Sequence, residues 1–125
     1  MINRFTLAVI LLLLTVILAG CADTASPVRL TWDEAAEIIS DGAIVLDVRS
    51  LNEFNTGHIP GAVSLPIDEI AEAVRHMIPD KEQIVLVYCR SGARSATAAA
   101  ILADMGYQNV FDLGGILDRE NGEFE

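Results

Sequence analysis

The residues best suited to covalent chemistry form one short segment around the cysteine at position 89. A cysteine thiolate is a strong nucleophile. Here the cysteine directly follows residues 84–88, an apolar run rich in β-branched side chains that predicts a buried strand. Because an alanine-rich helix is predicted over residues 95–105, Cys89 to Arg94 form a six-residue turn between strand and helix, which Gly92 allows to close tightly.

A turn of this kind can hold an anion. Backbone N–H groups that are free of helix hydrogen bonds converge above the sulfur, and the positive end of the helix points the same way. These groups, together with two arginines in the turn, favour the thiolate form of Cys89. We therefore predict Cys89 as the catalytic residue, with an anionic sulfur donor held by the turn. The predicted substrate-binding residues are Arg90, Ser91, Gly92, Ala93 and Arg94.

The individual roles within the turn remain open from the residues alone. Arg94 can hold the carbonyl groups of the turn or bind the negative end of a donor, and Arg90 can contact substrate or be a solvated charge. Ser91 and Ser95 can hydrogen-bond the sulfur, and Ser95 can instead cap its helix and support the loop.

A second polar strand end lies at Asp47-Val48-Arg49, where a charged pair ends the apolar run 43–48. Ligands bind at the carboxyl ends of strands in an open parallel sheet, so this segment is expected beside the cysteine. A thiolate that is already stabilised needs no base, so Asp47 is predicted to support the loop by accepting hydrogen bonds. Arg49 is predicted to support it as well, by pairing with Glu53.

Four stretches, in the same order, resemble the single-domain rhodaneses, a family of sulfurtransferases. They are the loop Cys89–Ser95, the strand end Asp47-Val48-Arg49, the segment Glu53-Phe54 with Gly57–Ala62, and Gly114-Gly115-Ile116. The resemblance implies a persulfide mechanism. Cys89 takes a sulfane sulfur from thiosulfate or a persulfide and passes it to cyanide or a thiol, without a metal or an organic cofactor. The acceptor thiol can belong to a protein. It also implies that His58 packs near the site without acting as a base.

Two features depart from related patterns. Phosphatases and arsenate reductases of the same fold resemble Cys-x5-Arg, whereas this chain has the shorter Cys89-x4-Arg94, which suits a terminal sulfur atom better than phosphate. Rhodaneses often carry a tryptophan soon after the paired glycines. Here residues 116–120 lack one, so docking of the C-terminal tail is not predicted. Trp32, the only tryptophan, is predicted to pack in the first helix rather than bind substrate.

The elements that must position these groups alternate between helix and strand. The predicted order is a helix from the capping box Thr31–Glu34 to Gly42, a strand at 43–48, one helical turn within 52–61, a strand at 62–65, a helix over 67–77, a strand at 84–88, a helix over 95–105 and a strand at 110–113. This alternation predicts an α/β fold with a parallel sheet and helices on both faces. The resemblance implies a rhodanese-like three-layer sandwich of about five strands.

Composition limits the partners and the number of domains. The chain has 125 residues, a net charge of −10 and 52% hydrophobic residues, which fits one folded domain. Basic residues are few and dispersed outside the cysteine turn, so nucleic acid is not an expected partner. The two histidines, His58 and His76, lie in no pattern typical of a metal site, and we predict none.

The N-terminus reads as an export signal. A short segment with Arg4 precedes an apolar run, and 15 of the first 20 residues are apolar. An uncleaved membrane helix is the alternative, although the run is at the lower limit for spanning. Leu18-Ala19-Gly20-Cys21 resembles the bacterial lipobox, in which the cysteine is lipidated.

These features predict a signal peptide at 1–20, a lipidated Cys21 and tether at 21–29, and a rhodanese-like domain at 30–125. The domain would be anchored to the extracytoplasmic side of a bacterial membrane. Lipid on Cys21 would leave Cys89 without a disulfide partner. The expected activity is that of a thiosulfate sulfurtransferase. The alternatives are a non-catalytic binding, carrier or sensor module and a phosphatase or arsenate reductase.

Overall fold

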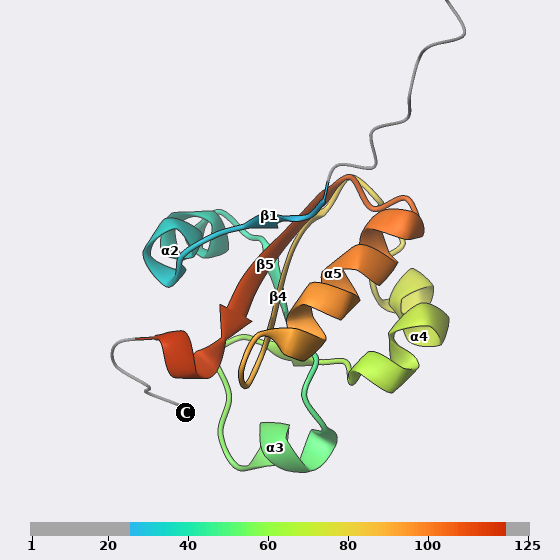
Figure 1. Cartoon of the computed structure of the whole chain (residues 1–125). Helices are drawn as coiled ribbons and strands as arrows, with labels where there is room; N and C mark the ends of the chain where they lie inside the picture. Colours follow the sequence, from blue (N-terminus) through green and yellow to red (C-terminus); the bar gives the residue numbers. More distant parts are fainter. Residues whose placement is uncertain (1–25, 120–125) are drawn as a thin grey trace, which may run out of the picture.

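The computed structural model describes residues 26–119, which form a five-stranded parallel sheet between helices (Figure 1). The strands are β1 (Val28–Arg29), β2 (Ile44–Asp47), β3 (Val63–Ser64), β4 (Ile84–Cys89) and β5 (Asn109–Gly115). The α-helices are α2 (Trp32–Ser40), α3 (Leu51–Asn55), α4 (Ile70–Met77) and α5 (Ala93–Asp104). Two 3₁₀ turns, η1 (Ile67–Glu69) and η2 (Ile116–Asp118), complete the described part.

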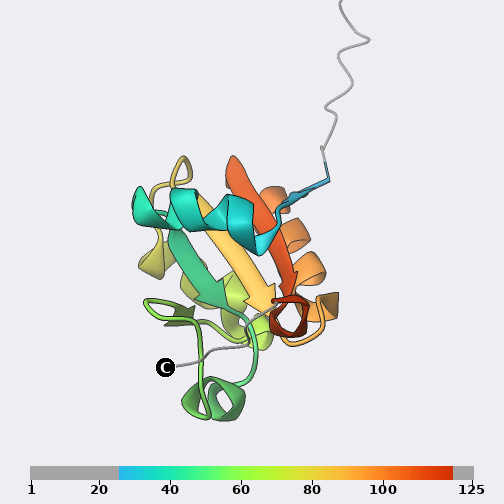
Figure 2. The same cartoon turned by 90° about the vertical axis from the view of Figure 1, so that its left-hand side faces the viewer.

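The order of the strands puts β4 at the centre of the sheet. The order is β1-β5-β4-β2-β3, and all neighbouring strands are parallel. Figure 2 shows β2, β4 and β5 pointing toward the same end of the molecule. The segments that follow β5 and β2 therefore lie on the two sides of the segment that follows β4.

Each face of the sheet is covered by its own helices. Alternate residues of β4 separate the two sides: Val85 and Val87 pack with α4 and α5, whereas Leu86 and Tyr88 pack with α2. In Figure 1, α2 lies on one side of the sheet and α4 and α5 lie on the other. The predicted α/β three-layer sandwich with about five parallel strands is confirmed.

Capping boxes fix the starts of two helices. The predicted box at Thr31 and Glu34 begins α2, with reciprocal hydrogen bonds between the two residues. A second box, at Ser50 and Glu53, begins α3 at the carboxyl edge of the sheet. The helical turn predicted within 52–61 thus exists, and it starts one residue earlier, at Leu51.

The structure corrects several boundaries. The helix predicted over 67–77 begins with the 3₁₀ turn η1 before α4, and the strand predicted at 110–113 extends to β5, Asn109–Gly115. Val28 and Arg29, predicted to belong to the tether, pair with Phe111 and Asp112 as the edge strand β1. A strand of two residues is too short to show an alternating apolar pattern, so only its pairing with β5 reveals it. Helix α5 begins at Ala93 rather than at residue 95, after a glycine N-cap with a φ of 98°.

The predicted signal peptide at 1–20, Cys21, residues 22–25 of the tether and the tail at 120–125 lie outside the described residues. None of the helices within residues 26–119 has the length and apolar content required to cross a bilayer.

Candidate active site

Cys89 is the last residue of the central strand, and its side chain is fully buried beneath the turn that follows it. Two backbone N–H groups donate to its Sγ, from Gly92 at 3.0 Å and from Ser95 at 3.4 Å. The left-handed conformation of Gly92 turns the chain back over the sulfur. The turn therefore encloses Cys89 in hydrogen-bond donors, as its sequence suggests.

These donors set the charge state of the thiol. Burial by itself raises the pKa of Cys89, but hydrogen bonds from the backbone and hydroxyl of Ser95 and from the N–H groups of Gly92 and Ser91 oppose it. The net result is a pKa below the usual value for cysteine. The site consequently stabilises the thiolate form of Cys89 relative to that of an ordinary cysteine.

Ser95 contacts the sulfur and supports the loop, but it does not cap its helix, because α5 begins at Ala93 with Gly92 as the N-cap. Its backbone N–H faces the sulfur, and its buried hydroxyl lies 3.0 Å from the carbonyl oxygen of Gly92 and 3.3 Å from that of Gly114. The hydroxyl thus links the turn to the end of β5. This contact keeps the N–H groups of the turn aimed at Sγ.

Arg94 joins two elements of the site. Its guanidinium donates to both carboxylate oxygens of Glu53, at 2.7 and 2.9 Å, and so ties α5 to α3. This ion pair lowers the pKa of Glu53 well below its usual range. The prediction that Arg49 pairs with Glu53 is wrong. Arg49 turns back to Asp47, which leaves Glu53 to Arg94.

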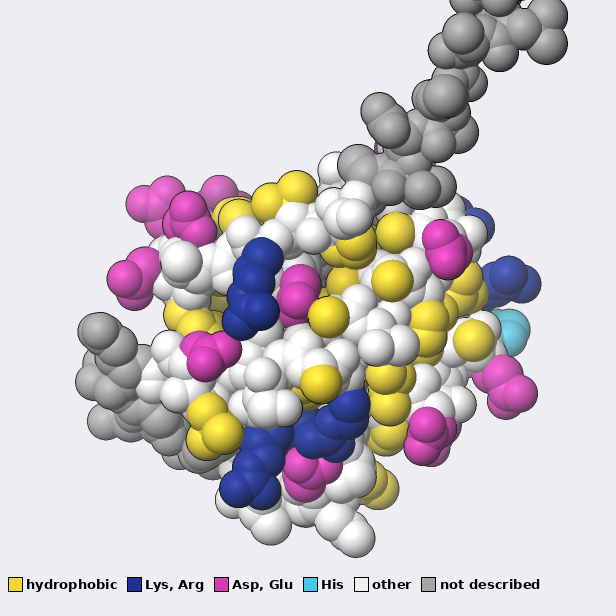
Figure 3. Space-filling view, viewed as in Figure 1, with side chains coloured by type: hydrophobic (Ala, Val, Ile, Leu, Met, Phe, Trp, Pro, Cys, Tyr) yellow, Lys and Arg dark blue, Asp and Glu magenta, His cyan; other side chains and the backbone are white. Residues whose placement is uncertain are grey.

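The outer rim of the turn is basic and exposed. Arg90, Ser91 and Ala93 are exposed, and Arg90 forms no salt bridge within residues 26–119. On the face shown in Figure 3, Lys and Arg side chains gather at the end of the molecule that holds this turn and α3. An otherwise acidic protein thus presents positive charge next to its thiolate.

A buried ionic network lies under the site. Arg49 donates to the carboxylate of Asp47 through Nη2 at 2.6 Å and through Nε at 3.0 Å. The hydroxyl of Tyr88 donates to Asp47 at 2.6 Å and accepts from the backbone of Ile59 at 3.1 Å. Arg49 also donates to the carbonyl of Gly57 at 2.7 Å. The network binds the ends of β2 and β4 to the loop that precedes β3.

Tyr88 is a site residue that the sequence reasoning missed. Its strand reads as uniformly apolar, so the sequence predicts only that Tyr88 is buried within that strand. One signal was available: Tyr88 precedes Cys89 and therefore points to the opposite face of the sheet, where Asp47 lies beside it in register. His58, by contrast, has the predicted packing role, with its ring stacked on Phe54 at 3.7 Å and its Nδ1 at 3.0 Å from the Phe54 carbonyl oxygen.

Two glycines let the turn lie directly on β5. A Cβ on Gly115 would lie 2.5 Å from the carbonyl oxygen of Arg90 and 2.8 Å from the backbone of Ser91. A Cβ on Gly92 would meet the backbone of Gly114 at 3.5 Å. Gly115 therefore has a steric reason, because any side chain at position 115 would displace the cysteine turn.

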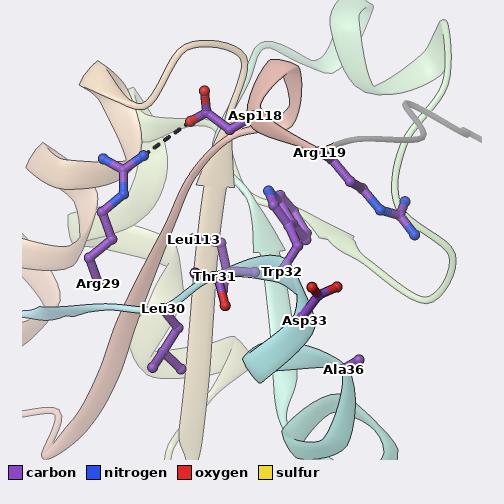
Figure 4. A pocket seen from close by; sticks show the side chains of 9 residues that line it. All are labelled: Arg29, Leu30, Thr31, Trp32, Asp33, Ala36, Leu113, Asp118 and Arg119. Atoms are coloured by element: carbon purple, nitrogen blue, oxygen red, sulfur yellow. Dashed lines mark hydrogen bonds and ion pairs between the residues drawn. The ribbon is translucent and has the colours of Figure 1, made fainter.

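A cleft of about 650 Å³ lies on the other side of η2, between β1, α2 and β5. Figure 4 shows Trp32 at its centre and the ion pair between Arg29 and Asp118 at its edge. Trp32 donates to the carbonyl oxygen of Gly115 at 3.3 Å and packs edge-on against Tyr88. It therefore packs behind the site, as predicted. The cysteine turn does not line this cleft.

Over residues 26–119, no group of three or more His, Cys, Asp or Glu side chains is arranged to hold a metal ion. Cys89 is a free thiol. The chemistry available to the described site is that of one thiolate, its backbone donors and the adjacent arginines.

The fold and the site together define a protein with a buried cysteine at the carboxyl edge of a parallel sheet, enclosed by a turn whose N–H groups donate to its sulfur. A family model described as the rhodanese-like domain matches residues 31–118. The chain belongs to this family.

Several of the similar proteins are named sulfurtransferases, and others are named tRNA uridine(34) hydroxylases. The chain is 38% identical over 73 residues to thiosulfate sulfurtransferase PspE of Escherichia coli K12, which covers 58% of this chain and 70% of the relative. It is 33% identical over 87 residues to thiosulfate sulfurtransferase GlpE of Pseudomonas entomophila, which covers 70% of this chain and 78% of that one. A solved structure of a rhodanese with anions from E. coli matches with a TM-score of 0.60 at 35% identity, covering 63% of this chain and 93% of that chain.

The lowered pKa of Cys89 predicts how its alkylation depends on pH. The rate of alkylation by iodoacetamide should reach half its maximum at a pH lower than the pKa of an ordinary cysteine, which is about 8.5. The Ser95→Ala variant should shift this midpoint upward, because it loses the hydroxyl that orders the turn. Thr97→Ala is the matched control, since its hydroxyl bonds only the helix carbonyl of Ala93. Equal midpoints in all three proteins would contradict this account.

The close contact at Gly115 predicts a steric effect on the turn. Gly115→Ala should lower the free energy of unfolding by about 2 kcal/mol, because the methyl group meets backbone atoms that cannot yield. It should also slow alkylation of Cys89 at pH 7. Gly42→Ala is the control. Its φ of 98° strains the backbone of an alanine, but no neighbouring atom meets the added methyl group. Urea unfolding and alkylation rates measure both effects, and normal Cys89 reactivity in Gly115→Ala would rule out the steric explanation.

Proposed function

We propose that this protein is a thiosulfate sulfurtransferase-like enzyme that carries sulfur as a persulfide on Cys89. The observation that carries the proposal is the buried sulfur that accepts hydrogen bonds from the N–H groups of Gly92 and Ser95. The sulfurtransferase names of the relatives support the same activity.

The first half-reaction loads the enzyme. The thiolate of Cys89 attacks the sulfane sulfur of thiosulfate and forms a new S–S bond. The bond between that sulfur and the sulfonate group breaks, and sulfite leaves with the electron pair. No proton and no external oxidant is needed. Arg90, exposed at the mouth of the turn, is placed to attract the dianion and to hold its sulfonate end.

The second half-reaction discharges the enzyme. A thiophilic acceptor such as cyanide or a thiolate attacks the outer sulfur of the persulfide, and Cys89 leaves as its thiolate. The donors that lower the pKa of Cys89 make it a good leaving group here. They also stabilise the negative charge of the persulfide between the two steps.

The dimensions of the turn favour sulfur over phosphate. Only three residues separate Cys89 from the first residue of α5, and the N–H groups of Gly92 and Ser95 point at Sγ itself. Arg94, the residue that would bind a phosphate oxygen in the longer loop, is engaged by Glu53. The turn therefore supports sulfur transfer better than phosphatase or arsenate reductase activity.

Intact mass spectrometry of the reduced protein tests this function. Thiosulfate should add one sulfur atom, and cyanide should then remove it as thiocyanate. Cys89→Ser should add none. Sulfur uptake without discharge to cyanide or to a thiol would favour the carrier or sensor alternative. Failure to take up sulfur from thiosulfate and from a low-molecular-weight persulfide would eliminate the sulfurtransferase function.

We further propose export and lipid anchoring through Cys21. The support is the apolar N-terminal run followed by Leu18-Ala19-Gly20-Cys21, at the place where a lipobox is expected. An anchor of more than one acyl chain holds a protein stably at a membrane. The catalytic domain would then work on the extracytoplasmic side.

Membrane fractionation of bacteria that express the full chain tests the anchor. The wild-type protein should be in the membrane fraction and should migrate as a lipid-modified species. Cys21→Ser should lose the modification, because position 21 then has no thiol to accept lipid. Cys89→Ser, the matched control, should still be anchored. A Cys21→Ser protein with unchanged mass and fractionation would exclude lipidation at this position.

A further inference from the structure

Two large apolar side chains are exposed on the segments that flank the cysteine turn. Leu117 in η2 is 68% exposed, and Leu51 at the start of α3 is 56% exposed. Leu117 follows β5 and Leu51 follows β2, the two strands on either side of β4. The two leucines therefore lie on opposite sides of Cys89 at one edge of the sheet.

Backbone and ion-pair contacts connect these leucines to the site. The N–H of Leu117 donates to the carbonyl oxygen of Arg90 at 3.3 Å. Leu51 belongs to the helix that Glu53 ties to Arg94. Movement of the leucines is thus limited by the same contacts that hold the turn.

A small anion gains no binding energy from the exposed side chains of Leu51 and Leu117. Thiosulfate needs positive charge and N–H donors, which Arg90 and the turn already supply. Two exposed leucines beside an exposed arginine instead fit an extended polypeptide with apolar side chains and a carboxylate. The cleft around Trp32 lies on the other side of η2 and is not part of this surface.

We propose that Leu51, Leu117 and Arg90 form a docking surface for the sulfur acceptor, and that the acceptor is a polypeptide cysteine with apolar neighbours. This proposal rests on the persulfide function of Cys89. The leucines contact apolar residues on the two sides of the acceptor cysteine, and Arg90 contacts a nearby carboxylate. Docking holds the acceptor thiolate in line with the outer sulfur of the persulfide.

The transfer step is balanced without a further reactant. The acceptor thiolate forms a bond to the outer sulfur, the S–S bond to Cys89 breaks, and Cys89 keeps that electron pair as a thiolate. The product is a persulfide on the acceptor polypeptide. Cys89 returns to the thiolate while the acceptor cysteine becomes a persulfide, so no net oxidation occurs.

Two synthetic peptides test the surface by activity. One has a leucine on each side of its cysteine and an adjacent glutamate, and the other has serines in place of the leucines. Wild-type protein loaded with thiosulfate should transfer sulfur to the leucine peptide with a kcat/KM about tenfold higher, as expected for burial of two partly exposed leucine side chains. Leu51→Ser and Leu117→Ser should each lose most of this preference and should discharge to cyanide at the wild-type rate.

Met77→Ser is the matched control variant. Met77 is 42% exposed, and it ends the helix that leads to the amino end of β4, away from Cys89. Its preference for the leucine peptide should equal that of the wild type. Equal rates with both peptides in the wild type, or an unchanged preference in both leucine variants, would overturn the docking proposal.

A binding measurement separates this proposal from the sulfurtransferase function. A version of the leucine peptide with serine in place of cysteine should shift the NMR signals of Leu51, Leu117 and Arg90 in the wild type. It should bind at least about threefold more weakly to Leu51→Ser and Leu117→Ser. Binding without any sulfur uptake would retain the surface and reject the sulfurtransferase function. Sulfur uptake without leucine-dependent binding or peptide preference would reject the surface alone.

Discussion

The structure depends on one requirement: several backbone N–H groups must point at a single buried sulfur. A thiolate removed from water is stable only if such donors replace its hydration. The turn after β4 achieves this by lying directly against the backbone of β5, which is why position 115 has no room for a side chain. Strand order, the glycine pair and the hydroxyl of Ser95 all serve this contact.

A second set of buried charges holds the neighbouring loops in place. Asp47 has no exposed surface, and Arg49 and Tyr88 both donate to its carboxylate. Removing one member of a buried ion pair costs about 3 kcal/mol or more, because the other charge remains unpaired. The network lies on the opposite face of the sheet from the thiol. It therefore stabilises the edge of the sheet through Arg49, Asp47 and Tyr88, separately from the donors of Cys89.

The sequence predicted the parts of the site that are local in the chain. Cys89 and its donors Gly92 and Ser95 all lie within residues 89–95, so strand, turn and helix signals in the sequence predict the turn that encloses the sulfur. Pairings between distant segments were harder to predict. Glu53 had two arginines as plausible partners, and only the three-dimensional structure shows that it pairs with Arg94. Strand β1 exists because β5 offers it a free edge, which no pattern within Val28–Arg29 reveals.

The direction of β1 determines how the domain faces whatever holds its N-terminal side. Val28 pairs with Phe111, whereas Cys89 pairs with Gly115, four residues further along β5. With about 3.3 Å per strand residue, the thiol lies about 13 Å further along the strand direction than the point where the chain enters the sheet. Attachment on the N-terminal side, to a membrane or to a sensor chip, thus leaves the reactive edge pointing outward. Partners in solution can approach it without crossing the attachment surface.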